Sequence, residues 1–217
     1  MPEPLRIVAH TGGIAQTNCF LVVDEGSKDA VLFDAPDHTV EPLLDHVDEH
    51  GLKLVGLWLT HGHYDHIADH AVVRERFPEA ELLVHRDDLP MLAAPQAALF
   101  QLPFDIPPAT PTGHVADGDR LHIGSIAVDV IHTPGHAPGH VCFHLPDHHV
   151  LIGGDLILMN AIGRTDLPGG DEATLMRSLR RIMQLLDETQ LLPGHGTADT
   201  LGRERQVNPF VAAALRG

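Results

Sequence analysis

Residues 60–66 read Thr-His-Gly-His-Tyr-Asp-His and directly follow the apolar run Leu-Val-Gly-Leu-Trp-Leu of residues 54–59. The apolar run predicts a buried strand that delivers a cluster of potential metal ligands into a loop, namely His61, His63, Asp65 and His66. Imidazole nitrogen and carboxylate oxygen suit zinc or iron. A polar loop rich in histidine is the alternative, because the chain contains 18 histidines in 217 residues. The tight spacing directly after a buried strand favours the metal site.

The composition indicates a folded protein of one domain spanning residues 1–217. Hydrophobic residues make up 43% of the chain, which is enough for a substantial buried core. No stretch approaches the roughly 18 consecutive apolar residues of a membrane span. The first residues lack the basic and then apolar pattern of an export signal. We therefore expect a cytoplasmic protein.

The charge balance bears on binding partners. The chain carries 14 basic and 30 acidic residues, a net charge of −16. This disfavours binding to nucleic acid or to an anionic membrane, because both require a cationic surface. Cys19 and Cys142 both lie in apolar, strand-like runs, so we expect packed and reduced thiols.

The first half of the chain predicts an antiparallel meander followed by a β-α-β unit. Short strands are expected at residues 5–10, 18–24 and 30–34, separated by glycine-containing turns. Apolar residues at helical spacing predict a helix over residues 39–49 before the strand 54–59. The cluster then lies at the carboxyl end of a strand, where open α/β sheets place their sites. A second helix from Ile67 to Phe77 and a strand at 82–85 follow.

The segment between Pro90 and Pro111 contains four further prolines, which leave room for only a short helix and a loop. Long irregular segments in compact domains often form a wall or lid of a site. A surface linker is the equal alternative here.

The second half repeats this organisation. Strands are predicted near residues 120–123, 125–132, 140–145 and 148–153, then a helix from Glu172 to about Asp187, a strand at 191–193 and a final helix near 203–215. Two strand-rich halves, each with helices, indicate an α/β (α+β) fold in which two mixed sheets pack face to face with the helices outside.

Three later residues also follow predicted strands and are flanked by glycine: His136, Asp155 and His195. Glycine allows the backbone to turn sharply and to approach an ion closely. Each of these residues alone would more often be structural. Together with the first cluster they make five histidines and two aspartates, a set that fits two adjacent metals sharing a bridging carboxylate and a bridging water.

Taken in order, these motifs resemble those of the metallo-β-lactamase fold. The matching stretches are residues 60–66, Thr-Pro-Gly-His at 133–136, Gly-Asp at 154–155 and Pro-Gly-His-Gly at 193–196, with Asp34 matching an aspartate near the start. The resemblance spans nearly the whole chain. It implies a four-layer αββα sandwich with the metals at one edge.

The resemblance also implies a role for each residue. His61, His63 and His136 would hold the first divalent ion, Asp65, His66 and His195 the second, and Asp155 would bridge them. We expect Zn²⁺, with iron or manganese as alternatives, and we expect Asp65 and Asp155 to be the catalytic residues. Asp34 would orient the ligand loop without binding metal. The neighbouring His132 and His140 match no ligand position and are interpreted as packing or supporting residues, as are His10, His85, His114 and His144.

Residues 162–171 and 200–210 resemble compact, single-domain glyoxalase II proteins, which are thioester hydrolases. Larger members carry an additional C-terminal domain that contacts glutathione, and we expect none here. The resemblance implies hydrolysis of a small acyl thioester such as S-lactoylglutathione by a metal-bridging hydroxide. The sequence leaves open whether the protein is a monomer or a dimer. Arg164 and Asp166 would shape the site entrance. Arg164 either meets an anionic substrate group or forms an internal pair with Asp166.

Other functions remain open on the same scaffold. The stretch Gly-Arg-Thr-Asp at residues 163–166 also resembles that of persulfide dioxygenases. The resemblance to those enzymes would imply a site with a single iron. A lactonase or β-lactamase would use the same ligands. A binding or scaffold protein without activity would not need seven ligands in order.

Overall fold

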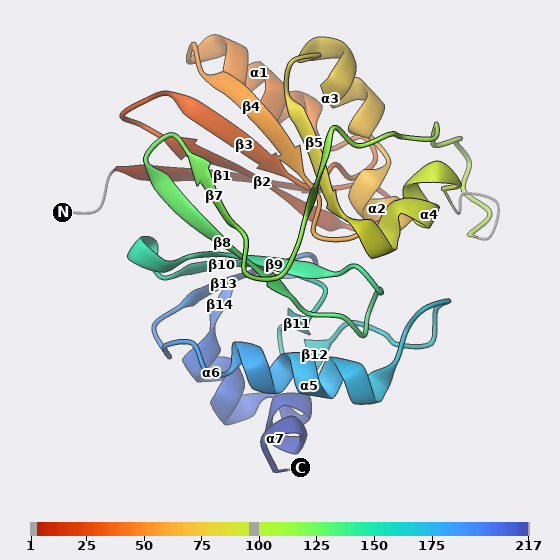
Figure 1. Ribbon diagram of the computed structural model, residues 1–217, viewed down its shortest axis with the longest axis vertical. Helices are drawn as coiled ribbons and strands as arrows, with labels where there is room; N and C mark the ends of the chain where they lie inside the picture. The colour runs from red at the N-terminus through yellow and green to blue at the C-terminus, as the bar shows by residue number, and fades with distance from the viewer. Residues whose placement is uncertain (1–3, 96–99, 217) are drawn as a thin grey trace.

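The computed structural model describes residues 4–95 and 100–216, which form four layers (Figure 1). Two six-stranded β-sheets pack face to face, and helices cover the outer face of each sheet. Helices α1 (Glu41–Glu49) and α3 (His70–Arg76) cover one sheet, and α5 (Glu172–Ile182), α6 (Leu201–Val207) and α7 (Pro209–Arg216) cover the other. The predicted αββα sandwich of two mixed sheets is confirmed.

The first sheet contains the N-terminal strands. Its order is β1 (Leu5–Gly12), β2 (Thr17–Asp24), β3 (Asp29–Phe33), β4 (Lys53–Trp58), β5 (Glu81–His85) and β6 (Gly113–Val115). The first three strands form the predicted antiparallel meander, whereas β3 to β6 run parallel. The sequence did not predict β6, because three residues after a proline-rich segment carry no readable alternation.

The second sheet is also mixed. Its order is β14 (Asp199–Thr200), β13 (Gln190–Pro193), β10 (Val150–Gly154), β9 (Val141–Leu145), β8 (Ile126–His132) and β7 (Arg120–Ile123). Only β10 and β13 pair in parallel. A separate hairpin joins β11 (Ile157–Leu158) to β12 (Ala161–Ile162). It was not predicted, and neither was β14, because two residues are too few to show a pattern.

Three apolar clusters fill the three interfaces between the four layers. Strand β2 shows how the sequence supplies two of them at once: Cys19 and Leu21 face the helix layer, whereas Phe20 and Val22 face the second sheet. Successive side chains of a strand point to opposite faces, so a strand buried on both sides reads as a continuous apolar run. As expected, Cys19 and Cys142 are buried and free.

The helix predicted after the ligand cluster is in fact two short helices, α2 (Tyr64–Ile67) and α3. The backbone N–H of Asp69 donates to the carbonyl of Ala35 at 2.8 Å, so it is not available to continue α2. The prediction that residues 60–66 form a loop is wrong for residues 64–66, which belong to α2. Asp65 and His66 lie on a helical turn that follows the extended residue His63.

The C-terminal helices also differ from their predicted bounds. Helix α5 ends at Ile182, five residues early, and Leu186, predicted on its buried side, is 54% exposed. The final helix is divided into α6 and α7. Asn208 between them is extended, because Pro209 lacks an N–H and disfavours the helical conformation in the residue before it.

A 3₁₀ turn (Arg86–Asp88) precedes the proline-rich segment, which begins within α4 (Leu89–Ala93) and continues as irregular chain towards β6. Part of it, residues 96–99, lies outside the described residues. Within residues 4–95 and 100–216, no helix is both long and apolar enough to cross a bilayer.

Candidate metal centre

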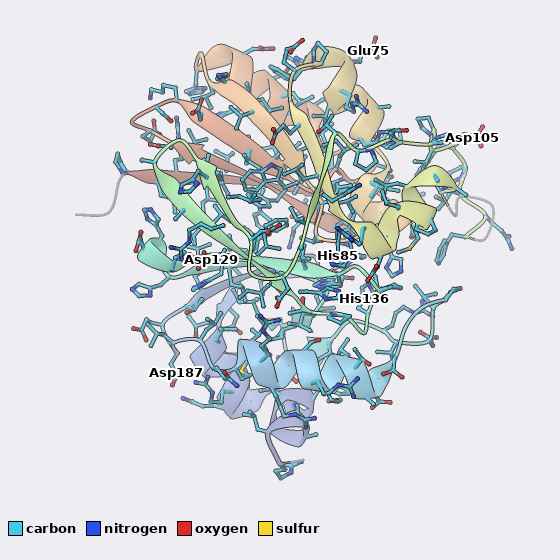
Figure 2. The ribbon with its side chains drawn as sticks, viewed as in Figure 1. Glu75, His85, Asp105, Asp129, His136 and Asp187 are labelled. Atoms are coloured by element: carbon cyan, nitrogen blue, oxygen red, sulfur yellow. The ribbon has the colours of Figure 1, made fainter. Side chains whose placement is uncertain are left out.

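All seven predicted ligand side chains lie together at one edge of the sandwich. The motif 60–66 follows β4, and His136, Asp155 and His195 follow β8, β10 and β13 of the other sheet. Figure 2 shows His136 on the second sheet's side of the boundary between the layers, with His85 on the first sheet's side. Residues distant in sequence therefore meet because the two sheets bring the ends of their strands to the same edge.

The first group consists of His61, His63 and His136, whose ligand atoms lie within 4.8 Å of one another. Nδ1 of His63 lies 2.9 Å from Nε2 of His136, which lies 3.2 Å from Nε2 of His61. Burial lowers the pKa of His61 well below its usual value and that of His63 to about 3. These imidazoles are therefore neutral and carry lone pairs.

Hydrogen bonds on the far side of two rings fix where those lone pairs point. The Nδ1–H of His136 donates to the carbonyl of Arg164 at 2.8 Å. Thr60 donates its hydroxyl proton to Asp34, so its oxygen accepts Nδ1–H of His61 at 3.0 Å. Both rings consequently present an unprotonated Nε2 to the same point. Two lone pairs 3.2 Å apart repel each other, and a cation between them removes the repulsion.

The second group consists of Asp65, His66 and His195, also within 4.8 Å. Nε2 of His195 lies 3.2 Å from Oδ2 of Asp65, and Nε2 of His66 lies 3.7 Å from the same oxygen. Burial opposes the charged form of His195, but hydrogen bonds to Asp155 and Asp65 outweigh it and raise its pKa to about 10. A proton thus occupies the position in which a metal would bind.

Asp155 lies between the two groups. Its Oδ2 is 3.5 Å from Nε2 of His136 and 3.3 Å from Nε2 of His195, and its Oδ1 is 3.5 Å from Nε2 of His66. Oδ1 of Asp155 and Nε2 of His66 are buried and have no hydrogen-bond partner among the described residues. Buried polar atoms without partners are costly. This nitrogen and carboxylate set fits two divalent ions, because imidazole and carboxylate suit zinc, iron and manganese.

Asp34 lies behind the candidate ligands and accepts hydrogen bonds from Thr60 and His66. Its Oδ1 accepts the backbone N–H of Thr60 at 2.7 Å, and its Oδ2 accepts the Thr60 hydroxyl and Nδ1–H of His66, both at 2.8 Å. One carboxylate therefore connects the ends of β3 and β4 and orients one histidine of each group, His61 through Thr60 and His66 directly.

Glycine is required at two positions beside Asp155. Gly154 adopts a φ of 49°, and a side chain there would meet His140 and Thr60. A Cβ on Gly194 would lie 2.2 Å from Oδ1 of Asp155. The glycines before Asp155 and His195 therefore allow the backbone to pack closely against neighbouring side chains of the candidate site.

The histidines interpreted as packing or supporting residues have distinct environments. Nε2 of His140 accepts the backbone N–H of Asp155 at 3.0 Å, and its Nδ1–H donates to Thr133 at 2.8 Å, so His140 positions the backbone of Asp155. His132 stacks on His85 with ring centroids 4.2 Å apart and contacts the carbonyl of Pro138. His10, His114 and His144 do not line the cavity beside the ligands.

Two supporting residues, Asp88 and Asn18, were not predicted from the sequence. Asp88 is buried and accepts the N–H groups of Gly62 at 2.8 Å and Gly139 at 2.6 Å, which joins the two loops that carry the first group. Burial raises its pKa to about 6. Asn18 donates to the carbonyls of Pro193 at 2.9 Å and Gly196 at 2.8 Å. Asp88 lies three residues after the end of β5, much as His136 lies four residues after the end of β8, and this position was the available signal.

A cavity of about 380 Å³ opens onto the ligands. The rings of Tyr64 and Phe100 form one wall, with centroids 4.6 Å apart, and Leu158 and Ile162 contribute another. Phe100 belongs to the proline-rich segment, so at least this residue supports the interpretation of that segment as a wall. A larger cavity of about 880 Å³ near Trp58 is not lined by any of the predicted ligands.

Arg164 and Asp166 pair with each other, one of the two alternatives that the sequence allowed, and their side chains are 59% and 67% exposed. The guanidinium contacts both carboxylate oxygens, with Nε to Oδ1 at 2.7 Å and Nη2 to Oδ2 at 2.8 Å. Arg164 lines the cavity, but its guanidinium is occupied by this carboxylate. Its backbone carbonyl supports His136, a contact that a sequence motif does not reveal.

Comparisons with known proteins agree with this geometry. Residues 12–195 match the model of the Metallo-beta-lactamase superfamily. The hydroxyacylglutathione hydrolase GloC of Haemophilus influenzae is 34% identical over 200 residues, covering 90% of this chain and 93% of that protein. The mitochondrial persulfide dioxygenase ETHE1 of Homo sapiens is 31% identical over 201 residues, covering 90% of this chain and 72% of that protein.

Two crystal structures have closely similar folds. The B3 metallo-beta-lactamase BLEG-1 has a TM-score of 0.87 and 32% identity, with 95% of this chain and 99% of that chain covered. TTHA1623, in a di-iron-bound form, has a TM-score of 0.83 and 36% identity, with 94% and 99% covered. These likenesses confirm the predicted fold family.

Proposed function

The chain belongs to the metallo-beta-lactamase superfamily, and on this premise we propose that it is a metal-dependent hydrolase of acyl thioesters of the S-lactoylglutathione type. One observation carries the proposal: two adjacent groups of buried imidazole and carboxylate ligands share Asp155 at the floor of a cavity. The similarity to a hydroxyacylglutathione hydrolase supports this reaction class.

We assign the first ion to His61, His63 and His136, the second to Asp65, His66 and His195, and both to Asp155. Zinc is the expected metal, with iron or manganese as alternatives. When bound, two such ions lower the pKa of water toward about 7 and polarise a carbonyl oxygen.

The carboxylates of Asp65 and Asp155 are the catalytic groups of this proposal. Both face the cavity, and the hydroxyl of Thr17 donates to Oδ2 of Asp65 at 3.1 Å, which limits the rotation of that side chain. Each carboxylate accepts a hydrogen bond from the attacking water and orients it towards the thioester carbon. As the new C–O bond forms and the C–S bond breaks, the water proton passes through these oxygens to the departing thiolate.

The chain's thiols do not act as nucleophiles in this scheme. Neither Cys19 nor Cys142 lines the cavity, and burial raises the pKa of Cys142 to about 12. Hydrolysis therefore proceeds by direct attack of water, with the walls at Tyr64 and Leu158 placing the substrate against the carboxylates.

A persulfide dioxygenase is the second candidate, favoured by the 31% identity to ETHE1 and by the Gly-Arg-Thr-Asp stretch at 163–166. A persulfide dioxygenase site would hold a single iron. This would leave the candidate ligands Asp65, His66 and His195 without a role. A lactonase or β-lactamase activity is the third candidate, supported by the likeness to BLEG-1.

Elemental analysis and turnover assays separate these functions. Thioester hydrolysis predicts two metals per chain and turnover of S-lactoylglutathione or other acyl thioesters, with His63→Ala and Asp155→Ala losing at least about a hundredfold in kcat/KM. One iron per chain with oxygen uptake on a persulfide would establish the dioxygenase instead. Turnover of lactones or β-lactams alone would establish the third candidate.

A further inference from the structure

Apart from Arg164, the residues that line the cavity beyond the candidate ligands are aromatic, aliphatic or glycine. Tyr64 and Phe100 pack against each other on one wall, with their ring planes tilted by 40°. The β11–β12 hairpin supplies Leu158 and Ile162, and Leu167 lies further along the chain. A substrate that reaches the carboxylates therefore places the rest of its atoms against hydrocarbon, which favours apolar groups.

Arg164 is the one lysine or arginine in the cavity lining among residues 4–95 and 100–216. One edge of its guanidinium, Nε and Nη2, already donates to the two carboxylate oxygens of Asp166, at 2.7 and 2.8 Å, in a pair whose side chains are 59% and 67% exposed. The segment 96–99 reads Gln-Ala-Ala-Leu in the sequence and contains neither residue type. Arg203, which contacts Asn160 beside the hairpin, is paired with Asp199 and Glu204.

The thiol part of a glutathione thioester carries two carboxylates and one ammonium group. A carboxylate placed against an apolar wall without a cationic partner loses hydration that nothing replaces. The net charge of −16 adds a repulsive field for anionic molecules. Both effects act against glutathione thioesters and leave uncharged thioesters unaffected.

Within the thioester class of the proposed function, on which this inference rests, we infer that the site selects substrates whose thiol part is uncharged and apolar over glutathione thioesters. The reacting groups are the same in both cases. The discrimination arises at the walls, from Tyr64, Phe100 and Leu158, and from the neutralised guanidinium of Arg164.

A matched pair of substrates tests the inference. S-lactoylglutathione and S-lactoyl-N-acetylcysteamine carry the same acyl group, and only the second has an uncharged thiol part. The expected kcat/KM is at least about tenfold higher for the N-acetylcysteamine thioester. Equal values, or a preference for S-lactoylglutathione, would overturn the inference while supporting thioester hydrolysis. Hydrolysis of neither compound, nor of other acyl thioesters, would contradict the proposed function itself.

Variants of the Arg164 pair provide a second test. Asp166→Asn releases the guanidinium, so the ratio of kcat/KM for S-lactoylglutathione to that for the uncharged thioester should rise about fivefold. Arg164→Gln should change this ratio by less than about threefold, because the guanidinium is already neutralised. The matched control is Asp129→Asn, which breaks the exposed pair with Arg120 far from the cavity and should leave the ratio unchanged (Figure 2). A selective tenfold loss of S-lactoylglutathione turnover in Arg164→Gln would show that Arg164 binds glutathione and would overturn the inference.

Discussion

Nδ1 of His66 lies 2.8 Å from Oδ2 of Asp34, and both side chains are buried. The other oxygen of the same carboxylate accepts the backbone N–H of Thr60. Asp34 therefore fixes the His66 proton on Nδ1 and leaves Nε2 facing Asp65 and Asp155. A single carboxylate outside the ligand set thus determines which nitrogen of His66 is available to a metal.

We predict that Asp34→Asn weakens metal binding at the second group by about 10- to 100-fold, because the amide accepts fewer hydrogen bonds from Thr60 and His66. Competition with a chromogenic chelator measures the affinity. Asp45→Asn, at an exposed carboxylate paired with Arg76, is the matched control and should bind metal like the wild type. Unchanged affinity in Asp34→Asn would contradict its orienting role.

Replacement of a ligand from each group should remove different ions. His66→Ala should mainly lose the second metal, because His66 contacts Asp65 and Asp155. His63→Ala should mainly lose the first, because it faces His136. Elemental analysis after dialysis gives the number of ions per chain, with circular dichroism as the check on folding. Equal loss or equal retention of both ions in the two variants would count against the assignment.

Metal affinity at the second group should rise with pH. In the metal-free protein, burial opposes protonation of His195, but hydrogen bonds to Asp155 and Asp65 raise its pKa to about 10. Metal binding must displace this proton, so it becomes easier as pH rises towards that value. Zinc titration in weakly buffered solution should release protons near neutral pH, and His195→Ala should release fewer. Proton release that His195→Ala leaves unchanged would contradict this prediction.

The contribution of Asp88 to the free energy of unfolding should fall as pH rises. Its pKa is raised by burial from 3.8 to about 6, so between these values the native state binds more protons than the unfolded state. Stability therefore falls with rising pH across this window, by about 3 kcal/mol for a shift of this size. The measurement is the free energy of urea unfolding of metal-free wild type and Asp88→Asn at pH 4 and pH 7.

The stability advantage of the wild type over Asp88→Asn should be largest at pH 4 and smaller at pH 7. The variant lacks the titrating group, so the comparison removes contributions from the other acids and histidines. The prediction would be contradicted if the difference in free energy of unfolding between wild type and Asp88→Asn were constant or grew with pH. In that case the N–H groups of Gly62 and Gly139 would stabilise the carboxylate enough to cancel the effect of burial on its pKa.

The sequence predicted the sandwich because its strands and helices carry clear periodicity. β2 reads as a continuous apolar run since both of its faces are buried. The final helix was predicted as one element because its apolar spacing continues through the break at Asn208, although Pro209 marked that break. The bounds of short elements such as β6 and β14 depend on tertiary pairing, which two or three residues do not encode.

The candidate ligand set could be predicted from the sequence because each member follows a strand within a distinctive motif. The supporting contacts were not, because they join segments far apart in sequence. Asp88 accepts the N–H of Gly139, and Asn18 donates to the carbonyls of Pro193 and Gly196. The sequence left open whether Arg164 contacts a substrate or pairs with Asp166, because both residues lie in one loop, and the pair is seen only in the structure.

The most direct test of the account is the metal content of the purified protein measured together with its turnover of acyl thioesters. We predict two divalent ions per chain, and hydrolysis that is lost when a chelator removes them and restored when zinc, iron or manganese is returned. A single ion per chain, or a fully loaded protein that hydrolyses no acyl thioester, would contradict the account.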